Sequence, residues 1–114
     1  MKLSVKSKVW LEIEGKPFFG EGRKRLLQEI EKTGSISSAA SKLGITYRRA
    51  WSYIKSMEER SGLKLVEKTK GGAGYGGTTL TKDGRKLIDY YEAISKGIRD
   101  EVDKKFKKFK FSYR

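Results

Sequence analysis

Five basic side chains stand in a stretch of this sequence that has no acid to neutralise them. The stretch from residue 32 to residue 57 lacks Asp and Glu but carries Lys32, Lys42, Arg48, Arg49 and Lys55. Ammonium and guanidinium groups bind phosphate oxygens, and the planar guanidinium of Arg can also bridge O6 and N7 of guanine. The chemistry offered here is therefore the binding of a polyanion, and DNA is the first partner to consider.

Two short helices over residues 35–61 are predicted to carry these side chains. Ser35 can cap the start of the first helix, and Gly44 suits the left-handed position just past its end. Thr46 can cap the second helix, which is expected to end at Ser61 and Gly62. The apolar stripes that face inward are Ile36, Ala39, Ala40 and Leu43 on the first helix, and Ala50, Ile54 and Met57 on the second. Two helices joined by such a tight turn are typical of a helix-turn-helix, whose second helix lies in the major groove.

Three positions on the second helix face away from its apolar stripe and are predicted to meet the bases. At about 100° per residue, Arg48, Ser52 and Lys55 fall within about 60° of one another. Arg48 points most directly outward, so we expect it on bases and Arg49 on phosphate. A bidentate Arg–guanine pair contributes roughly 1–3 kcal/mol of discrimination between bases.

Further phosphate contacts are predicted around the turn and at the helix N-termini, where hydroxyl and free N–H groups hold phosphate. The residues are Ser35, Ser37, Lys42, Thr46 and Tyr47. Capping alone is an equally good interpretation of Ser35 and Thr46. Trp51 and Tyr53 are expected to pack inward rather than stack on DNA. A charged helix face that simply meets water is the alternative for the whole helix pair.

Composition narrows the class of protein. The 114 residues suffice for one domain, and 27 Lys and Arg against 14 acids give a net charge of +13, which favours nucleic acid as a partner. There is no Cys and no His, so thiolate metal sites, disulfides and histidine catalysis are excluded. We expect no enzyme activity and no cofactor. No apolar run reaches the roughly 18 residues of a membrane span, so a cytoplasmic, nucleoid-associated protein is predicted.

The N-terminal third is expected to support the helix pair. Residues 5–13 alternate loosely between apolar and polar side chains and predict a strand, with a turn at 14–16 and a return strand at 17–19. A helix should then open at Gly20 and Glu21 and end at Gly34. The predicted fold class is α+β, mostly α: a winged helix-turn-helix with an N-terminal β-hairpin and a long C-terminal dimerisation helix, as a single domain over residues 1–114.

A second hairpin is predicted over residues 63–81, with strands at 63–68 and 78–81 around a glycine-rich loop. A flexible basic hairpin directly after a helix-turn-helix is what a wing requires, and Lys68, Lys70 and Tyr75 are its predicted DNA contacts. A hairpin loop without contacts is the alternative. The loop formally matches GxGxxG, but strand-like residues follow where a dinucleotide site needs a helix.

A long helix is expected over residues 82–109, capped by Thr81. Its apolar stripe is too long for a small domain to cover alone, so a second copy is predicted to cover it. The dimerisation residues are Leu87, Tyr91, Ile94, Ile98 and Val102. The basic and aromatic residues 104–114 are interpreted as the end of this helix and a basic extension. Fraying of this tail, or its binding to nucleic acid or a membrane surface, is the alternative.

Two segments resemble the N-terminal DNA-binding domain of ModE-type molybdate-responsive regulators, a winged helix-turn-helix related to that of LysR-type regulators. They are GSISSAASKLGITYRRAW and LVEKTKGGAGYGGTTLTKDGRKLI. The resemblance covers roughly residues 8–95. It implies a homodimeric, sequence-specific transcription regulator that uses the helix from Tyr47 as recognition helix and residues 68–78 as wing. The molybdate-binding C-terminal domain of such regulators is absent from this sequence, so regulation by molybdate is not expected and no small-molecule effector is assigned.

Double-stranded DNA and a second copy of the chain are thus the expected partners, and a membrane is not. The alternative is an architectural or chromatin-type protein that binds DNA with little base preference, because the net charge suits it equally well.

Overall fold

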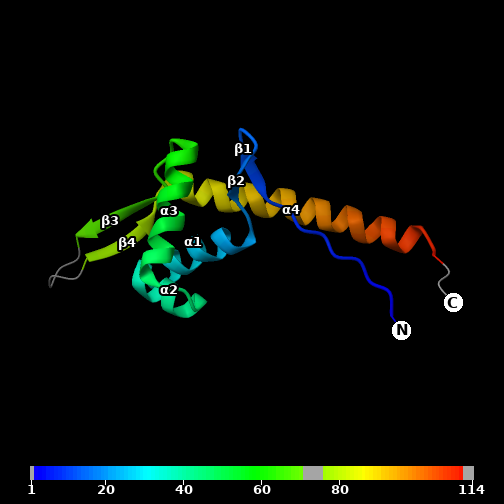
Figure 1. Ribbon diagram of the computed structural model, residues 1–114, viewed down its shortest axis with the longest axis horizontal. Helices are drawn as coiled ribbons and strands as arrows, with labels where there is room; N and C mark the ends of the chain where they lie inside the picture. The colour runs from blue at the N-terminus through cyan, green and yellow to red at the C-terminus, as the bar shows by residue number, and fades with distance from the viewer. Residues whose placement is uncertain (1, 71–75, 112–114) are drawn as a thin grey trace.

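The computed structural model describes residues 2–70 and 76–111, and this part of the chain forms four helices and two antiparallel hairpins (Figure 1). The hairpins pair β1 (Leu11–Ile13) with β2 (Lys16–Phe19) and β3 (Val66–Lys70) with β4 (Gly76–Leu80). The helices are α1 (Glu21–Thr33), α2 (Ile36–Leu43), α3 (Tyr47–Ser61) and α4 (Lys82–Lys108). The predicted fold class, mostly helical and of winged helix-turn-helix type, is confirmed.

Helix capping by hydroxyl groups explains where three of the helices begin. Ser35 accepts from the Ser38 N–H at 3.0 Å, Thr46 from that of Arg49 at 3.1 Å, and Thr81 from that of Gly84 at 3.0 Å. Each bond satisfies one of the N–H groups that a helix start leaves unpaired. These local contacts set the start of α2, α3 and α4 where the sequence predicted them.

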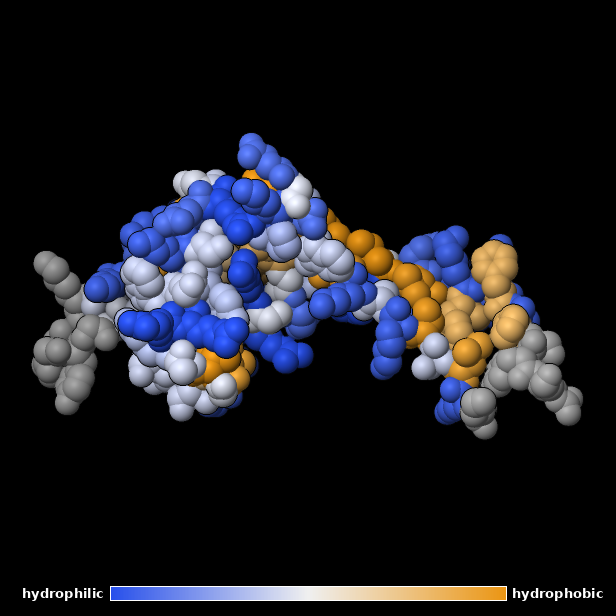
Figure 2. All heavy atoms as spheres, viewed as in Figure 1, coloured by the Kyte–Doolittle hydropathy of each residue, from blue (hydrophilic) through white to orange (hydrophobic). Residues whose placement is uncertain are grey.

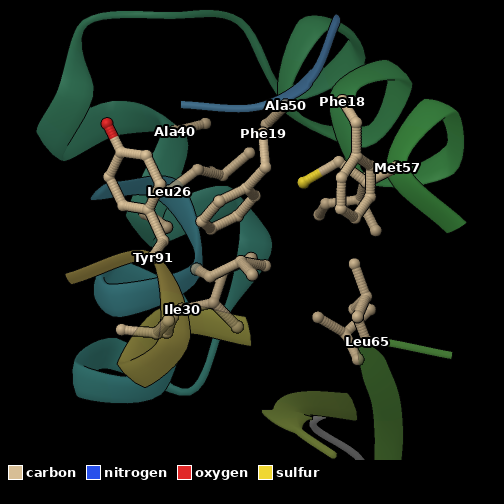
Figure 3. Close-up of a cluster of buried hydrophobic side chains, with 14 residues drawn as sticks. Phe18, Phe19, Leu26, Ile30, Ala40, Ala50, Met57, Leu65 and Tyr91 are labelled. Carbon is tan, nitrogen blue, oxygen red and sulfur yellow. The ribbon is translucent and has the colours of Figure 1, made fainter. Parts of the chain in front are cut away.

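The core lies where α1, α3, β2 and the first half of α4 meet (Figure 3). Phe19, Leu26, Ile30 and Met57 are almost fully buried there. The Phe19 and Tyr91 rings meet edge to face at 5.4 Å, which joins the N-terminal hairpin to α4. Leu65, just before β3, closes the same core. The helix-turn-helix therefore rests on packing that involves almost the whole chain.

The first strand is shorter than predicted, since residues 5–10 have no strand pairing. β2 has only four residues, so it provides partners for Leu11, Glu12 and Ile13 and no further. A β-strand needs a hydrogen-bonded neighbour, which the alternation of residue types alone does not supply. Residues 4–10 nevertheless keep the alternation, with Val5, Ser7 and Val9 half-buried between exposed neighbours.

The two strands of the second hairpin are shifted towards its loop relative to the prediction. β3 begins at Val66 rather than at residue 63, and β4 begins at Gly76 rather than at residue 78. The Glu58 carboxylate accepts hydrogen bonds from the N–H groups of Leu65 and Val66, at 2.8 and 3.3 Å. Thr81 donates to the Lys64 carbonyl at 2.6 Å, so this backbone is bound on both sides before the strand starts. These contacts join distant residues, which is why sequence periodicity could not locate the boundary.

α4 has 27 residues and extends well beyond the other helices and the two hairpins, as Figure 1 shows. Its first half packs on α1, and its buried residues there are Gly84, Ile88, Tyr91 and Ser95. Two predicted dimerisation residues need correction. Tyr91 is 2% exposed and belongs to the core of its own chain, and Leu87 is partly buried against that core. No described helix is long and apolar enough to cross a membrane.

Tyr91 should make the stability of the domain sensitive to alkaline pH. Its hydroxyl donates to the Val9 carbonyl at 2.7 Å. Burial raises the pKa of this phenol, the Glu21 carboxylate raises it further, and Lys24 and Arg99 lower it. The unfolded chain therefore loses this proton first, so stability falls as the pH rises above the ordinary value of about 10.

We expect Tyr91→Phe to lower the free energy of unfolding at pH 8 by about 1 kcal/mol, through loss of the hydrogen bond to Val9. This difference from the native protein should shrink at pH 10.5, because only the native protein has the Tyr91 proton to lose. Urea unfolding at both values measures it. Tyr90, which is exposed, provides the control: Tyr90→Phe should leave the free energy of unfolding unchanged at both pH values. A difference that is independent of pH for Tyr91→Phe would contradict the prediction.

Candidate nucleic-acid interface

The outer face of α3 brings together the side chains predicted to meet bases. Arg48, Ser52 and Lys55 are all exposed, while Ala50 and Ile54 on the opposite side are buried. Arg48 forms no ion pair with any described carboxylate. Hydrophilic side chains cover most of the face over α3 (Figure 2). The arrangement presents positive charge and hydrogen-bond donors on the exposed outer face of α3.

Trp51 lies on this surface, and the prediction that it packs inward is wrong. It is 44% exposed and lines a shallow hollow of about 550 Å³ together with Arg48, Ser52 and Lys55. The Lys55 Nζ lies 5.0 Å from the centroid of the indole ring, as in a cation–π contact. α2 and β2 pack on α3 elsewhere, so within the described part of the chain the ring stays largely exposed. The spacing of Trp51 and Lys55, four residues apart on one helix, was the signal available in the sequence.

Tyr53 is half-buried against the core, as expected, and it orients Arg49. Arg49 Nε donates to the Tyr53 hydroxyl at 2.9 Å. The guanidinium of Arg49 is therefore held beside α3, whereas that of Arg48 points outward with no described partner in an ion pair.

The side chains predicted to hold phosphate around the turn and at the helix N-termini divide into two kinds. Ser35 and Thr46 cap α2 and α3, as described above, and that structural role is confirmed. Ser37 and Lys42 are exposed on α2, and Tyr47 is 55% exposed at the start of α3. The contacts of all five with DNA remain predictions.

The β3–β4 hairpin extends from the domain beside α3 (Figure 1). It is anchored to the helix-turn-helix, because the Thr78 N–H donates to the Gly34 carbonyl at 2.8 Å, at the end of α1. Lys68 is exposed on β3, and Lys70 ends that strand. Tyr75, the third predicted wing contact, lies outside the described residues.

The second half of α4 carries the remaining predicted dimerisation residues. Ile98 is 42% exposed and Ile94 and Val102 are half-buried. An apolar band follows this half of the helix (Figure 2). The stripe that forms the core between residues 84 and 95 thus continues where the rest of the domain no longer covers it.

An exposed cationic helix after a tight turn, a hairpin beside it and a long helix behind it define a winged helix-turn-helix module. Residues 23–85 match the model of the bacterial regulatory helix-turn-helix proteins of the lysR family, and the chain belongs to this family. It is also 40% identical over 85 residues to the DNA-binding transcriptional dual regulator ModE of Escherichia coli K12, which confirms the resemblance to ModE-type regulators. That match covers 75% of this chain and 32% of ModE.

A second relative and two solved structures are also similar to this chain. The transcriptional regulator ModE of Haemophilus influenzae is 35% identical over 79 residues, which are 69% of this chain and 31% of that protein. The chain therefore spans about a third of the length of these relatives. The CbnR DNA-binding domain in its DNA complex has a TM-score of 0.56 at 17% identity, and covers 74% of this chain and 91% of that one. The BenM DNA-binding domain with benA site 1 DNA gives 0.53 at 21% identity, over 74% and 89%. These two structures establish the fold.

Proposed function

We propose that this chain binds double-stranded DNA in a sequence-dependent manner, as the DNA-reading part of a transcriptional regulator that acts as a homodimer. The observation that carries the proposal is the outer face of α3, where Arg48, Ser52 and Lys55 are exposed and no acid lies between residues 32 and 57. The relatives in the same family are transcriptional regulators by name. Such a protein acts where the DNA is, in the cytoplasm at the nucleoid.

In this proposal α3 enters the major groove and the β3–β4 hairpin contacts the flanking backbone. Arg48 reads a base, because its guanidinium is exposed at the N-terminal end of α3, the end that reads bases in helix-turn-helix proteins. Ser52 and Lys55 lie further along the same face. Ser35, Ser37, Lys42, Thr46, Tyr47 and Arg49 surround this face and bind phosphates, as do Lys68, Lys70 and Tyr75 from the wing.

A competition experiment tests the function directly. Bound sequences are selected from a random DNA pool at physiological salt, and the selected site is then competed against random DNA. A sequence-specific regulator should prefer its site by roughly 10³-fold or more. A ratio near unity with a steep dependence on salt would instead indicate an architectural protein that coats DNA.

Dimerisation is proposed through the exposed half of α4. The residues that share its apolar stripe are Ile94, Ile98, Val102, Phe106 and Phe109. Phe109 is 64% exposed, an unfavourable position for such a ring in water. A partner helix would cover this stripe. Two reading heads could then enter successive major grooves about 34–36 Å apart.

Replacing both Ile94 and Ile98 by Ser should produce a monomer in sedimentation analysis, because the change places two hydroxyl groups on the apolar stripe. Ala93→Ser is the control, since Ala93 is exposed elsewhere on the same helix. An intact dimer in the double variant would show that the interface lies at another surface. Circular dichroism should show that both variants remain folded.

A further inference from the structure

Two arginines contact one tyrosine at the side of α3, and a third arginine lies near one of them. The Arg23 guanidinium, from α1, lies 5.1 Å from the centroid of the Tyr53 ring, and that of Arg49 lies 6.0 Å from it. Arg49 also donates to the Tyr53 hydroxyl. Arg60, near the end of α3, is close enough to Arg23 to affect its titration. We call Arg23, Arg49, Arg60 and Tyr53 the arginine cluster.

The arginine cluster holds positive charge without a matching acid. Among the ion pairs of the described residues, none includes Arg23, Arg49 or Arg60. Their hydrogen-bond acceptors are neutral: Arg23 donates to the Phe18 carbonyl at 3.1 Å, and Arg60 to the Pro17 carbonyl at 2.9 Å. By contrast, Arg25 and Arg85 in the same domain each contact a carboxylate.

Electrostatics therefore favour an anion at this place. Burial lowers the pKa of the Arg23 guanidinium, the charge of Arg60 lowers it further, and Tyr53 acts in the opposite direction and raises it. Two positive charges without a counter-ion repel each other, and an anion between them would reverse the sign of that interaction. The contacts with Tyr53, including the hydrogen bond from Arg49, restrict both side chains in advance, so less side-chain freedom is lost when they bind an oxyanion.

The surface around Arg23 and Tyr53 is open to a ligand. Both residues line a hollow of about 620 Å³ between the N-terminal hairpin, the start of α1 and α3. Ile45, from the turn between α2 and α3, lines it as well. Arg23 and Tyr53 are thus accessible from this hollow, and Arg49 and Arg60 are exposed.

The dimensions of DNA indicate which anion reaches this place. A helix with its side chains is about 10–12 Å across and the major groove is about 12 Å wide, so a helix that reads bases has a sugar-phosphate backbone along each side. Arg49 follows Arg48 in α3 and therefore points about 100° away from it. If Arg48 faces the bases, Arg49 faces one of the two backbones, on the side of α3 where both Arg49 and Arg23 contact Tyr53.

We propose that Arg23 and Arg49, stacked on Tyr53, bind one backbone phosphate of the DNA strand that borders α3. This inference rests on the proposed function, because it needs α3 in the major groove. It adds a residue from α1 to the interface and assigns Tyr53 a positioning role. Arg60 donates a hydrogen bond to the Pro17 carbonyl in the N-terminal hairpin and adds positive charge to the same site.

Neutral phosphate analogues test the site. Duplexes that carry the selected sequence are made with a single methylphosphonate linkage, which removes one negative charge, at successive positions. Native protein should lose affinity by about tenfold or more at the linkage that the arginine cluster binds, as expected for a charge-assisted hydrogen-bond pair. The Arg49→Gln protein should bind unmodified DNA more weakly than the native protein does. Placing the neutral analogue at that one linkage should then weaken its binding little further. Arg23→Lys should behave in the same way, more weakly, since it keeps the charge and loses the planar fork.

Arg99→Gln is the matched control, because Arg99 also has a neutral acceptor, Ser95 Oγ at 3.0 Å, but lies on α4. This variant should show the full loss at every linkage that affects the native protein. The salt dependence of binding should also become shallower by about one unit of slope in Arg49→Gln and stay unchanged in Arg99→Gln.

The outcomes separate the inference from the proposed function. If the native protein prefers its site but no linkage is coupled to Arg49 or Arg23, the phosphate assignment fails and the function stands. If the native protein shows no preference for the selected site, both the proposed function and the phosphate assignment fail. Titration with inorganic phosphate, followed by the Nε–H resonances of Arg23 and Arg49, covers the other source of the anion. Saturation by free phosphate without any coupled linkage would overturn the assignment to DNA.

Discussion

Replacing Gly84 by Ala should lower the free energy of unfolding by about 2–3 kcal/mol, because an added methyl group has no space at this position. A Cβ built at Gly84 would lie 2.4 Å from the carbonyl oxygen and 3.3 Å from the carbonyl carbon of Leu65. This backbone cannot move away at low cost. Leu65 is fully buried, its N–H donates to the Glu58 carboxylate, and its carbonyl accepts from the Thr81 N–H at 3.0 Å.

Urea unfolding followed by circular dichroism measures this effect, and Gly97 in the same helix is the control. A Cβ at Gly97 would meet nothing within 4 Å. Gly97→Ala should therefore raise the stability by about 0.5–1 kcal/mol, since Ala loses less conformational entropy than Gly in a helix. Equal effects of the two changes would show that the start of α4 does not pack tightly on the segment before β3.

Arg48→Ala should relax base preference by roughly 10- to 100-fold at one position of the selected site, corresponding to a bidentate contact of about 1–3 kcal/mol. The reason is the geometry of α3. Arg48 is exposed opposite the buried Ala50 and Ile54, and it has no described carboxylate that would hold it away from DNA. Affinity for random DNA should fall much less, because phosphate contacts supply that binding.

The measurement compares affinities of native and variant protein for the selected site and for single-base changes at each position. Lys16→Ala is the control for loss of one positive charge, since Lys16 is exposed on the N-terminal hairpin. That variant should bind all sequences with unchanged preference. If Arg48→Ala instead loses affinity equally on every sequence, Arg48 binds a phosphate and another residue of α3 reads the base.

The helix-turn-helix could be predicted from sequence because it depends on local contacts. Ser35, Thr46 and Thr81 each bond to an N–H three residues ahead, so the capping pattern can be read within a few residues. The inward stripes repeat with the helical period, and Ala39, Ala50 and Met57 are buried as that period predicts. The β3–β4 hairpin could be predicted in the same way, because its residues directly follow those of the second helix in the sequence.

The errors concern residues whose surroundings come from distant parts of the chain. Tyr91 shares the helical stripe of Ile98 and Val102, but Val9, which precedes the N-terminal hairpin, and Phe19, which lies in it, contact Tyr91 and help to bury it. Trp51 borders the inner stripe of α3, yet among the residues that the structure describes no element covers that side, and the ring is exposed. Arg23 and Tyr53 are separated by most of the helix-turn-helix, and no spacing in the sequence relates them.

The sequence by itself determined the elements, their order and the acid-free cationic face, because hydrogen bonding and periodicity along a helix act within about four residues. Only the tertiary structure decided which apolar side chains are core and which are left exposed on α4. It also decided that Arg23 joins Arg49 around Tyr53. The physical reason is the same in both cases: burial and charge at a residue depend on every segment that packs against it, and these segments come from the whole length of the chain.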